Sequence, residues 1–421
     1  MSSKYTLAIA LIFAFSLGHA HSQDSWNQWR GNNRDSLVDG KWPEKLDDSN
    51  LKEAWSVPFA KSYSGPIIYG NTVITTETKD KKWEIVTALD KNTGKKLWST
   101  QWEGSMTVPF FAAKNGSWIR ATPATDGKYV FVPGILGLLV CLDFESGKEI
   151  WKVDLNKRYQ VTRESFGHVC SPLLMKGDKE SALYIQCAGG FVKMDRATGK
   201  EIWRSSLGTG NIMSGGAFSS PIVATLQGQK QIVIQTRNEL AGVEIADGKV
   251  KWTQKVPAFR GMNILTPTVL NDTVFTSSYN NKSFTYDVSQ PKAIKEKWNS
   301  SLRAYMSSPV LVGKNVYVHL QNKQIASFNL ETGATNWVSK ERTRFGDYMS
   351  MVACGDQVLG LDSRGILFLF KADPTKFEIV GQVKLKTNDS WAHLAVDQEK
   401  ETGVNRVYVR GLESLTMYRW K

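Results

Sequence analysis

The sequence predicts an all-β fold, an eight-bladed β-propeller of four-stranded antiparallel blades, and three observations lead to it. A short phrase ending in tryptophan recurs six times, at intervals of roughly 40–50 residues that are typical of stacked units. A small residue followed by proline precedes each copy. Strand-like segments separated by turn residues fill the intervals. Units of four antiparallel strands arranged radially form a propeller.

The recurring phrase predicts two short strands joined by a tight turn. Its copies are Ala88–Trp98, Cys141–Trp151, Lys193–Trp203, Gly242–Trp252, a looser Thr285–Trp298 and Ser327–Trp337. An acidic or amide residue at the start of the turn can accept backbone N–H bonds, and glycine supplies a positive φ. The closing tryptophan offers a large apolar face and an N–H that needs a partner. We therefore expect one such residue to pack each blade on its neighbour: Trp55, Trp98, Trp151, Trp203, Trp252, Trp298 and Trp337.

The small residue followed by proline marks the first strand of each unit. Proline is tolerated at the first residue of a strand, where its missing N–H does no harm. After Pro309, for example, the runs Val310–Val312 and Asn315–Leu320 flank the turn Gly313–Lys314. Each unit thus has four strands, with proline opening the first strand and tryptophan on the last.

Two further segments extend the count of blades beyond six. Val352–Leu385 has the strand pattern without the tryptophan, and Trp391–Trp420 supplies only three strands. Leu51–Val57 carries a tryptophan with no strands before it, so we expect it to complete the last blade and close the ring. Closure also hides the sheet edge that an open ring would expose. A seven-bladed ring is the alternative.

The chain divides into three parts. Residues 1–20 resemble a signal peptide, with Lys4, the apolar stretch Leu7–Leu17 and small residues before a cleavage site near Ala20. This stretch is too short to span a bilayer, and the first cysteine is Cys141, so we expect neither a transmembrane segment nor a lipid anchor. We expect an exported protein, periplasmic or extracellular. Residues 21–50 form an N-terminal segment that packs on the propeller, and 51–421 form the propeller.

Charge and cysteines narrow the chemistry. The formal net charge of +13 favours anionic partners, but the lysines are scattered over turns, so there is no specific nucleic-acid signal. Cys170 and Cys187 lie in one predicted hairpin and form either a disulfide or two buried free thiols. The sequence has no C-x-x-C motif and no Cys/His cluster, so no metal site is expected.

The phrase A-L-D-x-x-T-G-x-x-x-W resembles the repeat of the pyrroloquinoline-quinone (PQQ) propellers, in which it docks tryptophan between blades. Trp26–Asp35 is similar to the opening of exported PQQ-like propellers, and its Gly/Asn turn between aromatic and arginine residues predicts packing on the propeller surface.

The resemblance implies either of two activities. Quinoprotein dehydrogenases hold PQQ and Ca²⁺ on the propeller axis beside a catalytic Asp, whereas the lipoprotein of the outer-membrane β-barrel assembly machine is a non-catalytic scaffold. This sequence has no adjacent cysteine pair and no acidic constellation that matches calcium ligands, so we expect no cofactor. It also has no lipobox cysteine.

The connections between blades are the candidate binding site, because each delivers its last residues to the mouth of the central channel. They are rich in arginine and aromatic residues, and the candidates are Trp118, Arg120, His168, Arg260, Asn263, Arg303, Tyr305, Arg344, Tyr348 and Trp391. Arginine recognises carboxylates and aromatic faces stack on rings. Alternatively, the arginines cap carbonyls at blade edges and the aromatics fill a narrowing channel. Glu164 is the only acid in the loop of His168, so no catalytic residue is assigned.

Three functions follow. The first is an exported, non-catalytic scaffold that binds an envelope protein or an anionic ligand. The second is a PQQ- and calcium-dependent oxidoreductase. The third is a protein that binds or acts on carbohydrate at the same face, which would depend on Arg260 and Arg303.

Overall fold

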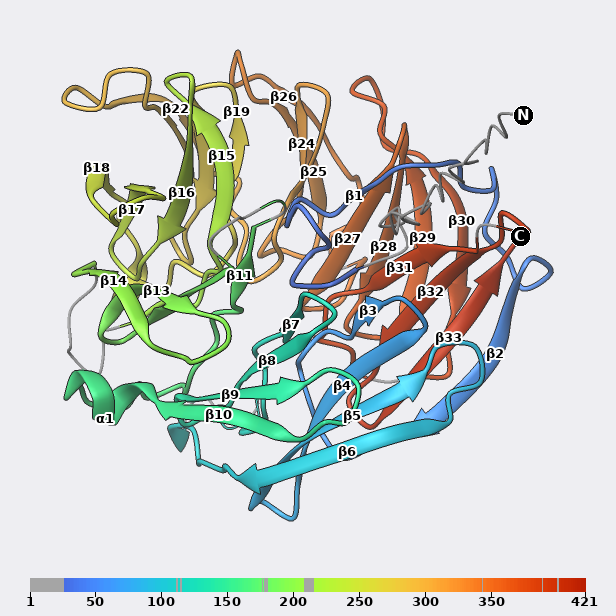
Figure 1. Cartoon of the computed structure of the whole chain (residues 1–421). Helices are drawn as coiled ribbons and strands as arrows, with labels where there is room; N and C mark the ends of the chain where they lie inside the picture. Colours follow the sequence, from blue (N-terminus) through green and yellow to red (C-terminus); the bar gives the residue numbers. More distant parts are fainter. Residues whose placement is uncertain are drawn as a thin grey trace, which may run out of the picture.

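In the computed structural model, the described residues are 26–110, 113, 116–175, 177, 181–207, 216–342, 344–387, 389–399 and 401–421. The predicted signal peptide, residues 1–20, lies outside them. In this part of the chain the strands form eight sheets, which stand radially around one axis as the blades of a propeller (Figure 1). The prediction of eight blades is therefore confirmed over the alternative of seven.

Blades 1 to 4 follow one another along the first half of the chain, each written from its innermost to its outermost strand. Blade 1 is β3 (Ile67–Tyr69), β4 (Thr72–Lys79), β5 (Trp83–Asp90) and β6 (Lys96–Glu103). Blade 2 is β7 (Ala124–Thr125), β8 (Tyr129–Pro133), β9 (Leu138–Asp143) and β10 (Glu149–Asp154), and the short helix α1 (Leu155–Tyr159) follows it. Blade 3 is β11 (Leu173–Leu174), β12 (Ala182–Cys187), β13 (Gly190–Asp195) and β14 (Glu201–Ser205). Blade 4 is β15 (Ile222–Leu226), β16 (Gln229–Gln235), β17 (Glu239–Glu244) and β18 (Val250–Lys255), followed by the 3-10 turn η2 (Phe259–Gly261).

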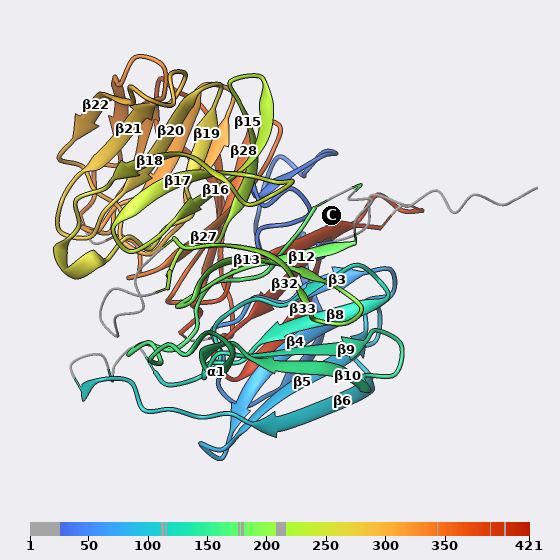
Figure 2. The same cartoon turned by 60° about the vertical axis from the view of Figure 1, so that its left-hand side comes forward.

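Blades 5 to 8 complete the ring. A view turned by 60° brings β15 to β22 forward (Figure 2). Blade 5 is β19 (Thr268–Leu270), β20 (Thr273–Ser277), β21 (Ser283–Asp287) and β22 (Lys295–Ser300). Blade 6 is β23 (Val310–Val312), β24 (Asn315–His319), β25 (Ile325–Asn329) and β26 (Thr335–Val338). Blade 7 is β27 (Met349–Cys354), β28 (Gln357–Asp362), β29 (Ile366–Lys371) and β30 (Ile379–Lys384), with β1 (Leu37–Val38) added in parallel to β27. Blade 8 is β31 (Ala395–Gln398), β32 (Asn405–Arg410), β33 (Ser414–Trp420) and, from the other end of the chain, β2 (Leu51–Pro58).

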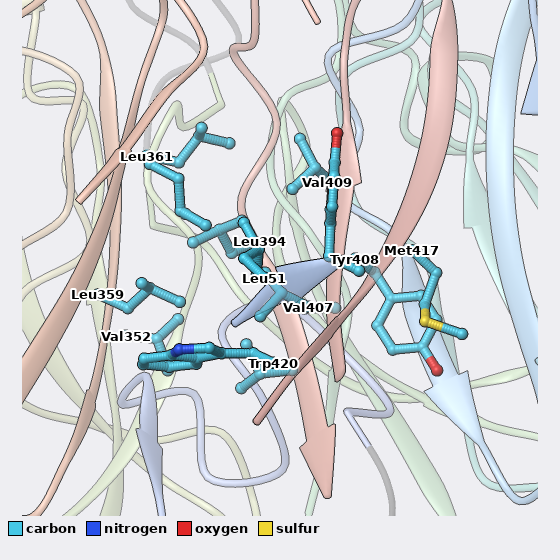
Figure 3. Close-up of a cluster of buried hydrophobic side chains, with 14 of the residues drawn as sticks. Leu51, Val352, Leu359, Leu361, Leu394, Val407, Tyr408, Val409, Met417 and Trp420 are labelled. Atoms are coloured by element: carbon cyan, nitrogen blue, oxygen red, sulfur yellow. The ribbon is translucent and has the colours of Figure 1, made fainter. Parts of the chain in front are cut away.

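The pairing of β2 with β33 closes the ring as predicted. The two strands run antiparallel from Leu51 opposite Trp420 to Pro58 opposite Ser414. A cluster of buried apolar side chains fills the seam between blades 7 and 8, where Val352 and Leu359 lie beside the ring of Trp420 (Figure 3). Closure is thus supported both by a strand ladder and by buried apolar surface.

The repeated tryptophans dock each blade on the next. Trp98 Nε1 donates to the carbonyl of Phe144 in the following blade, at 2.9 Å. Its ring lies over Gly147, where the backbone has φ 69° and a Cβ would come within 2.4 Å of the indole. The Thr/Ser-Gly turn and the tryptophan are therefore two halves of one contact. The same bond to a carbonyl of the following blade is made by Trp55, Trp151, Trp203, Trp298 and Trp337.

Trp252 is the exception. Its Nε1 donates to Gln231 Oε1 in its own blade at 3.1 Å. The carbonyl in the next blade, that of Val288, instead accepts from Gln227 Nε2. This is the junction with the looser copy of the phrase, which lacks the glycine turn that contacts Trp55, Trp98, Trp151, Trp203 and Trp298.

The small residue before each proline links neighbouring blades at the axis. Thr122 N–H donates to Ser171 Oγ at 2.9 Å, and Ser171 N–H donates to Ser220 Oγ at 2.9 Å. The same bond joins Gly65 to Thr122 and Thr266 to Ser308. Serine or threonine there satisfies a buried N–H of the preceding blade, and this explains why the position is small and polar.

The four cysteines Cys141, Cys170, Cys187 and Cys354 are free and buried. For Cys170 and Cys187 the structure therefore shows two thiols and not the disulfide alternative. Among the described residues, no helix has the length and apolar character needed to cross a membrane.

Candidate functional site

The N-terminal segment lies inside the ring. We call residues 26–36 the plug. In Figure 1 its trace, at the blue end of the colour scale, runs among the innermost strands. The sequence predicted that Trp26–Asp35 packs on the propeller surface; its hydrogen bonds place it at the axis instead.

Three consecutive plug residues bond to three consecutive blades. The backbone of Trp26 exchanges two hydrogen bonds with Ile68, at 2.9 and 3.0 Å. Asn27 Nδ2 donates to Thr125 O at 2.8 Å, and Asn27 O accepts from Thr125 N–H. The side-chain amide of Gln28 bonds to both backbone groups of Leu174 at 2.9 Å. The plug therefore forms hydrogen bonds with backbone groups at the free edges of β3, β7 and β11.

Two buried arginines continue this pattern. Arg30 donates to Ser36 Oγ at 2.7 Å and to Pro309 O. Arg34 donates to Pro172 O at 2.6 Å and to Ser171 O at 3.1 Å. Burial lowers the pKa of Arg30 to about 10 and that of Arg34 to about 9, so both guanidinium groups are charged at neutral pH. Carbonyls that face the axis are thus satisfied by charge-assisted hydrogen bonds.

The plug separates two cavities at opposite ends of the inner strands. The loop-side cavity, of about 150 Å³, is bounded by the connections between blades and by Trp29 of the plug. The hairpin-side cavity, of about 810 Å³, is bounded by the far ends of the inner strands and by plug residues 30–35. The loop-side lining is Trp29, Tyr63, Arg120, Phe166, Val169, Ser171, Phe218, Ser220, Met262, Ile264, Thr266, Tyr305, Met306, Ser308, Tyr348 and Trp391.

Four of the ten predicted site residues line the loop-side cavity: Arg120, Tyr305, Tyr348 and Trp391. The rings of Tyr348 and Trp391 are stacked, with centroids 5.7 Å apart. Arg120 donates to Gly116 O at 2.8 Å and to Trp118 O at 3.3 Å. Burial lowers the pKa of Arg120 to about 10, so it remains a cation.

The other aromatic and arginine candidates lie outside this lining. Trp118 packs edge-on against Tyr63. Arg260 lies over the ring of Phe259, with a positive φ of 51°. Arg303 donates to Gln321 Oε1 at 3.0 Å, and Arg344 pairs with Glu341 at 2.8 Å.

His168 and Asn263 are buried structural residues. His168 Nε2 lies 2.8 Å from Cys170 O, and burial lowers its pKa to about 4. Asn263 Nδ2 donates to Arg237 O and Val256 O, both at 3.1 Å. Glu164 has its pKa raised to about 8 by burial, and no hydrogen bond joins it to His168 among the described residues. The pair does not form a catalytic acid–base unit.

Sequence reasoning missed several lining residues. Phe166 and Phe218 lie in the same blade connections as the predicted residues, and they make an edge-on contact with centroids 5.6 Å apart. Trp29 and the plug arginines belong to Trp26–Asp35, which resembles the opening of PQQ-like propellers, but no local signal indicates that the segment enters the channel.

The loop-side cavity suits an apolar or aromatic group with a negative charge. Of the residues that the structure describes, its lining holds one cation, Arg120, and no carboxylate. Ca²⁺ requires oxygen ligands, several of them commonly carboxylates. The described residues contain no group of three or more His, Cys, Asp or Glu that could hold a metal ion. The residues at the axis therefore do not fit PQQ with Ca²⁺.

Comparison with known proteins gives two kinds of relative. A family model described as outer membrane protein assembly factor BamB matches residues 82–339. The chain is 25% identical over 317 residues to the outer membrane protein assembly factor BamB of Moranella endobia, covering 68% of this chain and 75% of that protein.

Two solved structures share the fold. BamB from Moraxella catarrhalis has a TM-score of 0.62 at 16% identity, covering 88% of this chain and 98% of that chain. A quinohemoprotein alcohol dehydrogenase from Pseudomonas putida HK5 has a TM-score of 0.67 at 12% identity, covering 94% of this chain and 80% of that chain. Both identities are low, so these likenesses concern the fold.

Proposed function

The chain belongs to the family of the outer membrane protein assembly factor BamB, and from this premise we propose that it is an exported, non-catalytic scaffold that binds a protein of the cell envelope. Export rests on the signal-like residues 1–20 and on the family, whose name refers to the outer membrane. The periplasm is the compartment that we propose.

One observation carries the non-catalytic part of the proposal: the channel axis is filled by the chain itself. Polar groups of Trp26, Gln28 and Arg34 form hydrogen bonds with the inner strands or with the residue just before them. Neither Arg30 nor Arg34 is more than 2% exposed. A cofactor on the axis would have to displace these bonds and leave buried carbonyls without partners, which costs free energy.

We propose that the loop-side face takes part in partner binding. Aromatic residues and arginine are the side chains that most often dominate binding energy at protein interfaces. Here Arg120 lies beside the stacked Tyr348 and Trp391 in one cavity. An acidic or aromatic side chain of a partner would find both a counter-charge and ring faces there.

Site-specific photocrosslinking tests this face. A photoreactive phenylalanine analogue at Phe166 or Trp391, in the loop-side cavity, is compared with the same analogue at exposed Lys96 on β6. We expect one discrete envelope adduct from the cavity positions, weakened by Arg120→Ala and unaffected by Arg303→Ala, since Arg303 lies outside the lining. Adducts of equal yield from Lys96 would contradict the assignment.

The dehydrogenase alternative is tested separately. The structural likeness to the alcohol dehydrogenase concerns the fold, and the described lining of the loop-side cavity holds no carboxylate. Purified mature protein is titrated with PQQ and Ca²⁺ and examined by native mass spectrometry. We propose that no stoichiometric complex forms; such a complex would overturn the scaffold proposal.

Arg260 and Arg303, on which carbohydrate binding was expected to depend, do not share a cavity with the other candidates.

A further inference from the structure

In the part of the chain that the structure describes, the N-terminal segment makes no hydrogen bond to the inner strand of blade 4. In each of the other seven blades, the segment bonds either to the inner strand or to the residues just before that strand. Trp26, Asn27 and Gln28 serve blades 1, 2 and 3, whereas the next residue, Trp29, donates to Thr266 of blade 5 at 3.1 Å.

The same order of contacts continues in the blades after blade 5. Arg30 donates to Pro309 of blade 6, β1 pairs with β27 of blade 7, and Ser36 Oγ bonds to His393 of blade 8 at 3.2 Å. Among the described residues, no hydrogen bond joins the plug to β15 (Ile222–Leu226). The described plug residues thus bond to the blades on either side of blade 4 but not to its inner strand.

Strand β15 is also unusual in length and exposure. It has five residues, whereas β3, β7, β11, β19 and β23 have two or three. Only β27, with six, is longer, and β1 covers it. Val223 and Ala224 are half-buried and Thr225 is exposed. An unpaired strand edge offers a row of N–H and C=O groups to another extended chain.

The hairpin-side cavity lies along this strand and is basic. Residues 222–225 line its wall, together with apolar Leu173, Val269 and Leu311. Among the described residues, its charged lining consists of Arg30, Arg34, Lys230 and a single carboxylate, Asp35. Lys230 is exposed and has no ion pair among the described residues. The described lining of the cavity therefore carries a net positive charge.

We infer that β15 accepts an extended segment of a partner protein as a fifth strand, with alternating apolar side chains and at least one acidic side chain directed to Lys230. Strand addition supplies main-chain bonds for affinity, and the pockets for alternate side chains supply specificity. The molecule already uses this device, because β1 is a fifth strand on blade 7. The inference rests on the proposed scaffold function and assigns it a second surface.

The probe is the acetylated and amidated heptapeptide Thr-Val-Glu-Val-Asp-Val-Thr. Isothermal titration of the mature protein measures its affinity, and hydrogen exchange locates it. We expect saturable binding and slowed exchange in residues 222–226. Lys230→Glu should weaken binding by about fivefold, the size of one exposed ion pair. Lys249→Glu, on the exposed outer turn of the same blade, is the matched control and should leave the affinity unchanged.

Two further peptides separate backbone pairing from charge. A version with alternate N-methylated residues should not bind, since it lacks the donors on one edge. A version with lysine in place of both acidic residues should bind more weakly. The inference is wrong if the probe does not bind, if it protects only another region, or if the N-methylated peptide binds equally well. A negative result here together with a positive crosslink at the loop-side cavity would overturn the β15 site and leave the scaffold function standing.

Discussion

Gln28 and Leu174 are joined by two hydrogen bonds that run in opposite directions. Gln28 Nε2 donates to Leu174 O and Leu174 N–H donates to Gln28 Oε1, both at 2.9 Å. The side-chain amide thereby imitates the peptide group of a neighbouring strand and caps the inner edge of β11. Both residues are buried, with at most 4% of their surface exposed.

Replacing Gln28 with leucine should destabilise the protein by about 3 kcal/mol, because the buried N–H and C=O of Leu174 both lose their partner. Urea unfolding of Gln28→Leu against wild type measures the difference. Gln101→Leu, at an exposed position on β6, is the control and should change the stability by less than about 0.5 kcal/mol. Equal effects of the two substitutions would show that the Gln28 bonds contribute nothing.

Replacing Trp98 with phenylalanine should cost about 2 kcal/mol. The variant keeps an aromatic face on Gly147 but leaves the carbonyl of Phe144 without its donor. Thermal unfolding gives the comparison, and Trp83→Phe, at a half-buried position on β5, is the reference. A stability unchanged by Trp98→Phe would mean that the docking contact depends on shape alone.

Glu164→Gln should stabilise the protein at pH 8 and change the stability less near pH 4. The pKa of Glu164 is raised to about 8 by burial, from about 4.5, so the folded state binds the extra proton between these values. Its contribution to stability is present below pH 4.5 and is lost as the pH rises through 8. Melting temperatures from pH 4 to 9 measure this. A parallel profile for wild type and variant would contradict the buried-acid interpretation.

His393→Gln should flatten the acid limb of the same profile. Burial lowers the pKa of His393 to about 3, so its stabilising contribution is present above the unfolded value of about 6.5 and is lost as the pH falls through the folded value. The imidazole stacks on Trp26 at 6.0 Å and contacts Trp29 at 5.1 Å, so protonation should also loosen the plug. Between pH 7 and 5 the melting temperature of the wild type should fall more than that of the variant. Tryptophan fluorescence near pH 3, where the folded His393 protonates, reports the plug.

Four free thiols per chain should react with a disulfide reagent in denaturant without reductant, and almost none in the native protein at pH 8. All four cysteines are buried, and burial raises the pKa of Cys170 and Cys187 to about 12, so the thiolate is scarce. Two reactive thiols in denaturant would instead indicate a disulfide between Cys170 and Cys187.

Much of the fold could be predicted because its signals are local and repeated. The phrase around Trp98 specifies a strand, a positive-φ turn and a docking side chain within eleven residues, and six copies make the period plain. Even the closing strand could be predicted, as Leu51–Val57 against Leu51–Pro58 in the structure, because its tryptophan has no blade of its own.

The candidate site was harder to predict. Arg120 and Arg303 look equivalent in the sequence, since each leads toward a strand-opening proline. In the structure Arg120 lines the loop-side cavity, whereas Arg303 makes a solvent-exposed hydrogen bond to Gln321. The direction of a loop side chain depends on the neighbouring blade, and no local pattern records it.

The sequence by itself determined the propeller class, the closing strand and the docking tryptophans, because these follow from short-range turn chemistry and a recurring motif, whereas the structure decided eight blades over seven. Only the tertiary structure decided that Trp26–Ser36 fills the axis. The bonds of that segment reach partners as distant in sequence as Leu174 and Pro309. They form because eight inner edges converge on one channel and leave buried peptide groups that a short polar segment can satisfy.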